Sequence, residues 1–232
     1  MSRISAQFSH DPAPAEAGLP AHERVYRQMR DMILFGALAP GQPVTIQGLT
    51  ETLGAGMTPV REALRRLTAE GALDFQGNRR IAVPVLDASA IAELTVARLA
   101  LEPELARRAT MRMDADGIAA LGQADAAIDT AIAAGDITGY LTGNHHFHAL
   151  LNSYADAPIL TGLVETLWLR FGPSLRVVCG RFGTEGLPDR HKDLLAALID
   201  RDAEAAARAM SEDVRQGMEQ IAQGIAPPSE AG

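Results

Sequence analysis

The chain has 232 residues, a net charge of −8 at neutral pH and only 4% aromatic residues. This length suits two compact domains of ordinary size. The acidic balance argues against nonspecific binding of nucleic acid by the whole molecule. Cys179 is the only cysteine, which excludes an internal disulfide and fits a reducing compartment. No apolar run has the length of a transmembrane helix, so we expect a cytoplasmic protein without membrane contact.

The charge is distributed unevenly along the chain. Residues 21–86 contain eight arginines and six acidic residues, whereas residues 87–232 contain twelve basic and 21 acidic residues. A modestly basic segment joined to an acidic one indicates two domains with different tasks. Residues 1–20 are rich in Pro, Ala and Ser, and we expect a flexible tail there.

The N-terminal segment opens with two predicted helices. Apolar residues at helical spacing predict a first helix over about residues 21–35, which Gly36 ends. Thr45 has the side chain of a helix cap and predicts a second, short helix that continues to Leu53. A glycine-rich tight turn at residues 54–56 then leads to a third helix.

The stretch PVREALRRL predicts that the third helix has two different faces. Thr58 takes the N-cap position and Pro59 the first helical position, where its missing N–H costs nothing. Arg61 and Arg65 share an exposed face, and Gly71 ends the helix. Four apolar residues are expected to face inward: Val60, Ala63, Leu64 and Leu67.

Two short strand-like runs follow, residues 73–75 and 81–85, around a turn that contains Arg79 and Arg80. Two helices joined by a glycine turn, an arginine-bearing second helix and a basic hairpin form the plan of a winged helix-turn-helix. In that plan the second helix enters the DNA major groove, and the wing reaches phosphates or the minor groove. The alternative is a small helical domain whose arginines are simply solvated.

The pattern changes after Pro84. Asp87 is placed to cap a long helix that runs to about Met113. Breaks at later turns predict five further helices, at residues 115–134, 137–153, 157–179, 187–200 and 202–224. Antiparallel helices of this length form a bundle that can hold a ligand inside. The predicted fold is therefore mainly α, with an N-terminal winged helix-turn-helix domain followed by an all-α antiparallel helical bundle.

The run LTETLGAGMTPVREALRRLTAEGAL and the basic hairpin after it resemble the DNA-binding domain of GntR-family bacterial transcription regulators. The segments IAELTVARLALE and NHHFHALL resemble the FadR-type, FCD-class ligand-sensing domain of that family. The resemblance covers about residues 20–224. It implies a DNA-binding domain over residues 21–86 and an effector-binding and dimerisation domain over residues 87–226.

The resemblance also implies DNA contacts at the start of the recognition helix, in the preceding helix and in the wing. These positions are Gln47, Met57, Thr58, Arg61, Arg65, Arg79 and Arg80. Gly56 and Met57 stand where the family usually has Ser or Thr and then Arg, and Arg80 stands where it usually has Gly. These departures bear on the operator sequence, because direct readout depends on side-chain type. Arg61 is retained and is the strongest candidate for a DNA contact.

A further set of residues resembles the metal ligands of metal-binding FCD-class proteins. The resemblance assigns Asn144 and His148, which share one helical face, together with His191 on a later helix. Asp213 falls at the fourth position, where His is commoner in the family. Imidazole and carboxylate together suit zinc, nickel or manganese, and the carboxylate shifts the preference toward harder cations. The alternative is a buried polar cluster without metal.

Arg98 matches a family arginine that points toward the effector cavity, where a guanidinium suits a carboxylate by bidentate pairing. The alternative is a salt bridge from Arg98 to Glu102, four residues later.

Taken with the family, these residues imply a ligand-responsive transcriptional regulator rather than an enzyme. We expect a homodimer that binds a near-palindromic operator in double-stranded DNA. We also expect a repressor that is released by a small carboxylate effector. A metal-dependent enzyme built on the bundle and a protein-interaction adaptor are the alternatives, although no nucleophile–base pair stands out to serve a catalyst.

Overall fold

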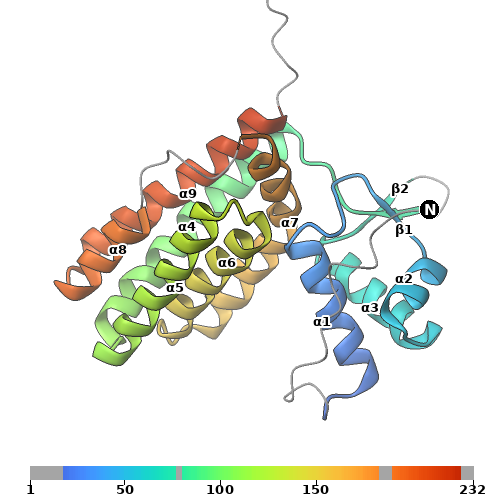
Figure 1. Cartoon of the computed structure of the whole chain (residues 1–232), viewed down its shortest axis with the longest axis horizontal. Coiled ribbons are helices and arrows are strands. Elements are labelled where there is room, and N and C mark those ends of the chain that lie inside the picture. Colours follow the sequence, from blue (N-terminus) through green and yellow to red (C-terminus); the bar gives the residue numbers. More distant parts are fainter. Residues whose placement is uncertain (1–17, 77–79, 183–189, 226–232) are drawn as a thin grey trace, which may run out of the picture.

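The computed structural model describes residues 18–76, 80–182 and 190–225 (Figure 1). A small unit of helices and short strands lies beside a larger bundle of helices (Figure 1). Most of the predicted tail and the wing residue Arg79 lie outside the described residues. In the part of the chain that the structure describes, no helix is both long and apolar enough to cross a membrane.

The small unit contains the predicted helices and a three-stranded antiparallel sheet. Its elements are α1 (Ala21–Leu34), β1 (Pro43–Val44), α2 (Ile46–Leu53), α3 (Met57–Ala69), β2 (Asp74–Gln76) and β3 (Arg80–Ala82). The strand order is β1-β3-β2. The cap predicted for α2 is confirmed, since the Thr45 hydroxyl accepts a hydrogen bond from the Gly48 N–H at 3.1 Å. The strand β1 was not predicted from the sequence, because it forms only by pairing with β3.

The start of α3 differs from the prediction, and the assignment of Thr58 as its cap is wrong. The helix begins at Met57 with Gly56 in the N-cap position, and no side chain caps it. Pro59 is therefore the third helical residue. It is tolerated there because the first N–H groups of a helix have no partner within the helix. The predicted end is confirmed, since Gly71 has a φ of +73°, in the left-handed region that glycine adopts freely.

The bundle contains all the helices predicted after Pro84. They are α4 (Ala88–Arg112), α5 (Ala115–Ala133), α6 (Ile137–Ser153), α7 (Pro158–Phe182), α8 (Arg190–Ile199) and α9 (Ala203–Ile225). The Asp87 carboxylate caps α4 as predicted by accepting a hydrogen bond from the Ala90 N–H at 2.8 Å. The helix α7 extends past the expected stop, because Gly180 continues the helix instead of ending it.

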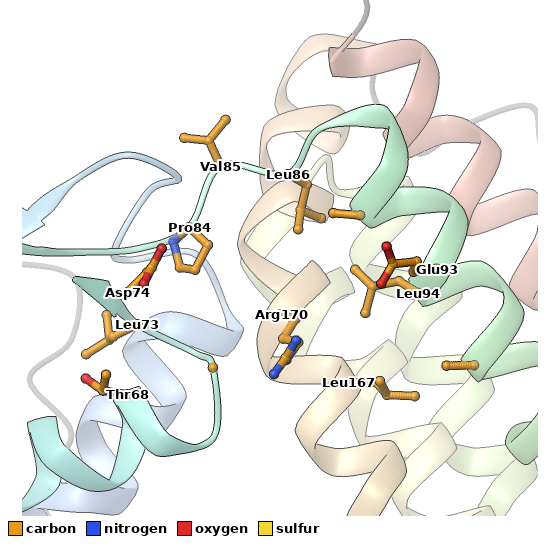
Figure 2. Close-up of a pocket in the computed structure, with 13 residues that line it drawn as sticks. Thr68, Leu73, Asp74, Pro84, Val85, Leu86, Glu93, Leu94, Leu167 and Arg170 are labelled. Atoms are coloured by element: carbon orange, nitrogen blue, oxygen red, sulfur yellow. The ribbon is translucent and has the colours of Figure 1, made fainter. Parts of the chain in front are cut away.

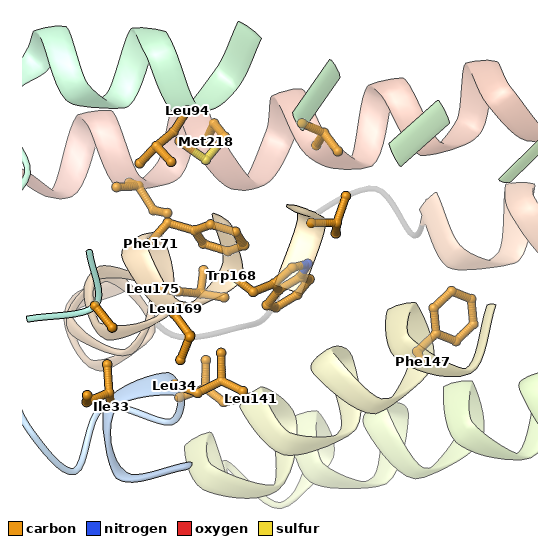
Figure 3. Packing of buried hydrophobic residues seen from close by; sticks show 14 of the residues in the cluster. Ile33, Leu34, Leu94, Leu141, Phe147, Trp168, Leu169, Phe171, Leu175 and Met218 are labelled. Atoms are coloured by element: carbon orange, nitrogen blue, oxygen red, sulfur yellow. The ribbon is translucent and has the colours of Figure 1, made fainter. Parts of the chain in front are cut away.

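A single cluster of buried apolar side chains runs through both units, and α7 lies at its centre. Trp168, Phe171 and Leu175 on α7 point between the surrounding helices, with Leu34 of α1 nearby (Figure 3). Burial of each such side chain contributes about 1.5–3 kcal/mol. The position of α7 is therefore fixed by packing against both units.

The contact between α7 and α1 depends on a glycine. A Cβ atom at Gly172 would lie 2.6 Å from the Leu34 carbonyl oxygen, a distance that such atoms do not tolerate. On either side of it along α7, Arg170 lies against Gly71 and Arg176 lies against Gly36. The same helix therefore contacts the chain just after α1 and just after α3.

Replacing Gly172 with alanine should separate α7 from α1. We expect Gly172→Ala to lower the free energy of unfolding by about 1–3 kcal/mol, because overpacking shifts the backbone. Gly162→Ala is the matched control, since a Cβ there meets nothing within 4 Å. It should leave stability unchanged or raise it by about 0.5–1 kcal/mol. Equal denaturation midpoints for the two variants would contradict the close contact.

Candidate functional site

The exposed face of α3 carries the arginines predicted to contact DNA. Arg61 and Arg65 are both exposed and line a groove of about 420 Å³ between α3 and the sheet. Among the described residues, neither guanidinium makes an ion pair. Phe75 of β2 lines the same groove and is 62% exposed. This face is therefore a surface of unpaired positive charge beside the wing.

Arg66, the next arginine of α3, has a different role. Its guanidinium pairs with Glu23 of α1 and with Glu70, each at 3.1 Å, and lies 3.5 Å from the centre of the Tyr26 ring. These contacts hold α3 against α1. The arginines at the groove are thus carried on a helix that is fixed to α1 along a neighbouring face.

The other predicted DNA contacts described by the structure are also at the surface. Met57 and Thr58 are exposed at the first turn of α3, and Arg80 is exposed at the start of β3. Gln47 is exposed on α2 and donates a hydrogen bond to the Glu51 carboxylate at 3.1 Å.

In the bundle, the structure brings together three of the four predicted metal ligands. Ligand atoms of His148, His191 and Asp213 all lie within 4.8 Å of one another. His148 Nε2 lies 3.3 Å from one Asp213 carboxylate oxygen, and His191 Nε2 lies 3.7 Å from the other. Asn144, one turn before His148 on α6, is buried and lines the same small cavity as His148 and Asp213.

Two carboxylates that were not predicted as site residues lie behind the imidazoles. Glu102 lies 3.6 Å from His148 Nδ1, and Asp125 lies 3.3 Å from His191 Nδ1. From the sequence, Glu102 was expected only as a partner for Arg98, and Asp125 was not predicted. The signal for Asp125 was a carboxylate on the face of α5 that also carries buried Leu121 and Ile128.

The chemistry of the cluster fits a divalent metal ion. The Nε2 atoms of both histidines are buried and have no hydrogen-bond partner among the described residues. Leaving such an atom unsatisfied costs about 1–3 kcal/mol. Two imidazole nitrogens and a carboxylate oxygen are ligands that first-row divalent ions accept.

The electrostatics of the cluster are strongly coupled. Burial alone would lower the pKa of His148, but the Asp213 and Glu102 carboxylates outweigh it and raise this pKa to about 9. Burial acts in the opposite direction on Glu102, yet Arg98 and His148 hold its pKa below the usual value. The carboxylates thus stabilise positive charge at this place, whether a proton or an ion carries it.

Arg98 forms the salt bridge to Glu102 that was the alternative to an effector contact. The two side chains make two hydrogen bonds, Nε to Oε1 at 2.5 Å and Nη2 to Oε2 at 3.1 Å, and both are almost fully buried. The guanidinium also lies 4.1 Å from the centre of the Phe171 ring. Arg98 still lines the small cavity beside His148, which has a volume of about 40 Å³.

A larger hollow of about 470 Å³ lies where the chain passes from the small unit to the bundle (Figure 2). Leu73 and Pro84 line it on the side of the small unit, and Leu86, Leu167 and Arg170 line it on the side of the bundle (Figure 2). None of the predicted site residues lines this hollow.

Comparison with known proteins gives two family matches that follow each other along the chain. The gntR family of bacterial regulatory proteins matches residues 21–83. The FCD domain matches residues 93–216, which is more than half of the chain.

Individual relatives match over most of their length. The HTH-type transcriptional regulator McbR of Escherichia coli K12 is 28% identical over 198 residues, which cover 84% of this chain and 90% of that protein. The HTH-type transcriptional repressor RspR of the same strain is 26% identical over 208 residues, which cover 88% of this chain and 90% of that protein.

Solved structures agree with these matches. The structure of E. coli McbR/YncC superposes with a TM-score of 0.82 at 27% identity, over 88% of this chain and 98% of that one. A putative GntR regulator from Rhodococcus sp. RHA1 gives a TM-score of 0.72 at 26% identity, over 89% of this chain and 99% of that one. The chain therefore belongs to the GntR family of bacterial transcriptional regulators, with a helix-turn-helix domain followed by an FCD domain.

Proposed function

We propose that this regulator is a homodimeric repressor that a small carboxylate releases from its operator, with a divalent metal ion in the FCD bundle. Residues 21–86 form the DNA-binding domain in this proposal, and residues 87–226 bind the effector and form the dimer; residue 226 lies outside the described part of the chain. Two features of the structure support the proposal. The exposed face of α3 carries unpaired arginines on one side of α7, and the buried cluster of His148, His191 and Asp213 lies on the other side of α7.

DNA recognition would use the exposed face of α3. Among the described residues, Arg61 and Arg65 make no ion pair with a carboxylate. Binding of their guanidinium groups to DNA would therefore break no such ion pair. Two copies of the helix would enter successive major grooves of a near-palindromic site. Arg79 and Arg80 are proposed to meet phosphates at the wing, where contacts add affinity without reading sequence.

The homodimer has support from apolar side chains on the surface. Ile159 and Leu163, one turn apart near the start of α7, are 79% and 51% exposed. Val96 of α4 is 70% exposed. Contiguous apolar patches are typical of surfaces that another chain covers, and the proposal is that a second copy of this chain covers these side chains. We also propose a cytoplasmic location, because the proposed partner is genomic DNA.

The metal site would use His148, His191 and Asp213, with Asn144 as the fourth ligand. Zinc, nickel or manganese would supply a Lewis-acidic centre that attracts the oxygens of an acidic effector. Arg98 would orient that acid, because it lines the same cavity. Its guanidinium N–H groups could donate hydrogen bonds to the acid once their hydrogen bonds to Glu102 are broken.

Effector binding would have to enlarge the cavity. A volume of about 40 Å³ admits little more than water, whereas ligand pockets commonly measure about 300–1,000 Å³. Trp168, Phe171 and Leu175 of α7 form part of its wall. Displacing them would move α7, which also contacts the ends of α1 and α3, so the two states would differ in how the DNA-binding domain is held.

A metal-dependent enzyme is the rival function for the same bundle. The relatives named above are regulators, which supports a sensing role for the cluster instead. Turnover of candidate acids by the purified, metal-loaded protein would revive the rival.

Replacing Arg61 tests the DNA-binding face. We expect Arg61→Ala to weaken specific operator binding by about 1–3 kcal/mol per half-site, because a bidentate base contact is lost twice in a dimer. Arg112→Ala is the control, since it removes the same charge from an exposed position at the end of α4. Fluorescence anisotropy with a promoter fragment measures both. Equal dissociation constants for Arg61→Ala and the parent would rule out a contact to DNA.

Replacing Arg98 tests the effector site. Alanine would leave Glu102 buried without its partner, so we choose Arg98→Lys, which keeps the charge but loses the two-pronged geometry. We expect the variant to bind DNA like the parent and to need at least about tenfold more carboxylate for release, since one charge-assisted hydrogen bond is worth about 1.5–3 kcal/mol. The carboxylate is the one that most raises the parent's melting temperature in a thermal-shift screen. Release at the parent's concentration would contradict the assignment.

Replacing His148 tests the metal site. We expect the parent to carry near one equivalent of metal per chain after gel filtration in metal-free buffer, and His148→Ala to carry much less, because one imidazole ligand is gone. His146→Ala is the matched control, since His146 lies on the same helix but is exposed. Elemental analysis, followed by add-back of zinc, nickel and manganese, provides the measurement. An empty parent whose melting temperature no ion raises would make the cluster a polar patch only.

A further inference from the structure

Each histidine of the buried cluster has a second carboxylate on its far side. Asp125 Oδ1 lies 3.3 Å from His191 Nδ1, and Glu102 Oε2 lies 3.6 Å from His148 Nδ1. The Nε2 atoms of both rings face Asp213 instead. We infer that Asp125 and Glu102 are positioning residues, which determine that each histidine presents Nε2 to the metal ion. The inference rests on the proposed metal site and deepens it.

The chemical reason lies in the two nitrogens of a neutral imidazole. One nitrogen carries a proton and the other carries the lone pair that binds a metal. A carboxylate at Nδ1 accepts that proton's hydrogen bond, which leaves the lone pair on Nε2 and fixes the ring's orientation. With the proton on Nε2, an N–H would point at Asp213 and the ion would lose a ligand.

His191 is held most completely. Phe147 stacks on its ring, with centroids 4.0 Å apart and planes inclined by 17°, while Asp125 contacts its edge. Asp125 also lies 3.9 Å from the Lys192 ammonium group, which is closer to Asp129, at 2.9 Å. Within the described residues, His191 Nδ1 is thus nearer to this carboxylate than the Lys192 ammonium is, and the carboxylate is only 4% exposed.

The burial of the Asp125 carboxylate calls for a physical reason. Moving a carboxylate out of water costs several kcal/mol unless partners compensate for it. An apolar residue would fill this position of α5 at no such cost, beside Leu121 and Ile128. A carboxylate that orients a metal ligand gives a physical reason for the charge.

Glu102 lies on the corresponding side of His148, but at 3.6 Å it makes no hydrogen bond to Nδ1, and its carboxylate is shared. Its Oε2 accepts a hydrogen bond from Arg98 Nη2 at 3.1 Å. One carboxylate therefore contacts both the proposed effector arginine and a proposed metal ligand. An acid that draws Arg98 away from Glu102 would change the support of His148 at the same time.

Asp125 gives the cleaner experiment, because removing the Glu102 charge would leave Arg98 buried without its ion pair. Asp125→Asn keeps the shape of the side chain but makes it a weaker acceptor. Cobalt(II) is the probe: its dissociation constant is measured by competition with a chelator, and its visible absorption spectrum reports the ligand set. Asp129→Asn is the matched control, since Asp129 lies one turn further along α5, is exposed and contacts the same Lys192.

We expect Asp125→Asn to raise the cobalt dissociation constant about 10–100-fold, the usual effect of losing such a partner. The spectrum should keep the parent's band positions, because the same atoms bind the ion, and the melting temperature of the metal-free protein should change little. Asp125→Ala should lose more affinity, since it leaves Nδ1 without an acceptor. Asp129→Asn should match the parent in all respects.

Two results would overturn the inference while leaving the metal site intact. One is a parent that binds cobalt while Asp125→Asn and Asp125→Ala bind it with unchanged affinity. The other is a loss of affinity matched by a large fall in the metal-free melting temperature and by shifted bands, which would assign Asp125 to packing. A parent that binds no cobalt at all would instead remove the proposed metal site itself, and the inference with it.

Discussion

The arrangement of the whole molecule depends on the close approach of α7 to the end of α1. Gly172 leaves no side chain between the helix and the Leu34 carbonyl oxygen, so the two backbones come nearly into contact. Arg170 and Arg176 flank this point and lie against Gly71 and Gly36, two glycines with left-handed backbone conformations that end α3 and α1. The DNA-binding helices are thus held by one helix of the FCD bundle as well as by the chain connection.

That same helix forms part of the wall of the cavity beside the histidine cluster. Trp168 lies 5.1 Å from the His148 ring and 5.2 Å from the His145 ring, and His145 lies 5.7 Å from Phe35, just after α1. These ring contacts form a continuous path from the cluster to the DNA-binding domain. Because packed interiors have little free volume, a side chain that moves at one end of such a path displaces its neighbours.

Inside the bundle, buried charges compensate one another. Glu102 contacts Arg98 and His148, and His148 contacts Asp213. Each charge would be costly to bury alone, and the low polarity of the interior strengthens the attraction between neighbours. A ligand that adds or removes charge at this place would change the balance among these groups.

The sequence by itself determined the helices and the plan of both domains, because their signals are local. Apolar spacing and caps such as Thr45 and Asp87 act over one or two turns, and they set the helix positions to within a few residues. The start of α3 was misplaced because Gly56 and Thr58 are both acceptable caps, and only the packed backbone decides between them. The strand β1 was missed because a two-residue strand exists only through its partner.

For the site, spacing on one helix placed Asn144 beside His148, and family resemblance supplied His191 and Asp213. Only the tertiary structure decided that three of these side chains meet, that Arg98 is occupied by Glu102, and that Asp125 stands behind His191. These residues come from helices separated by long stretches of chain. Their distances follow from how the helices pack, and no periodicity within a single helix encodes that packing.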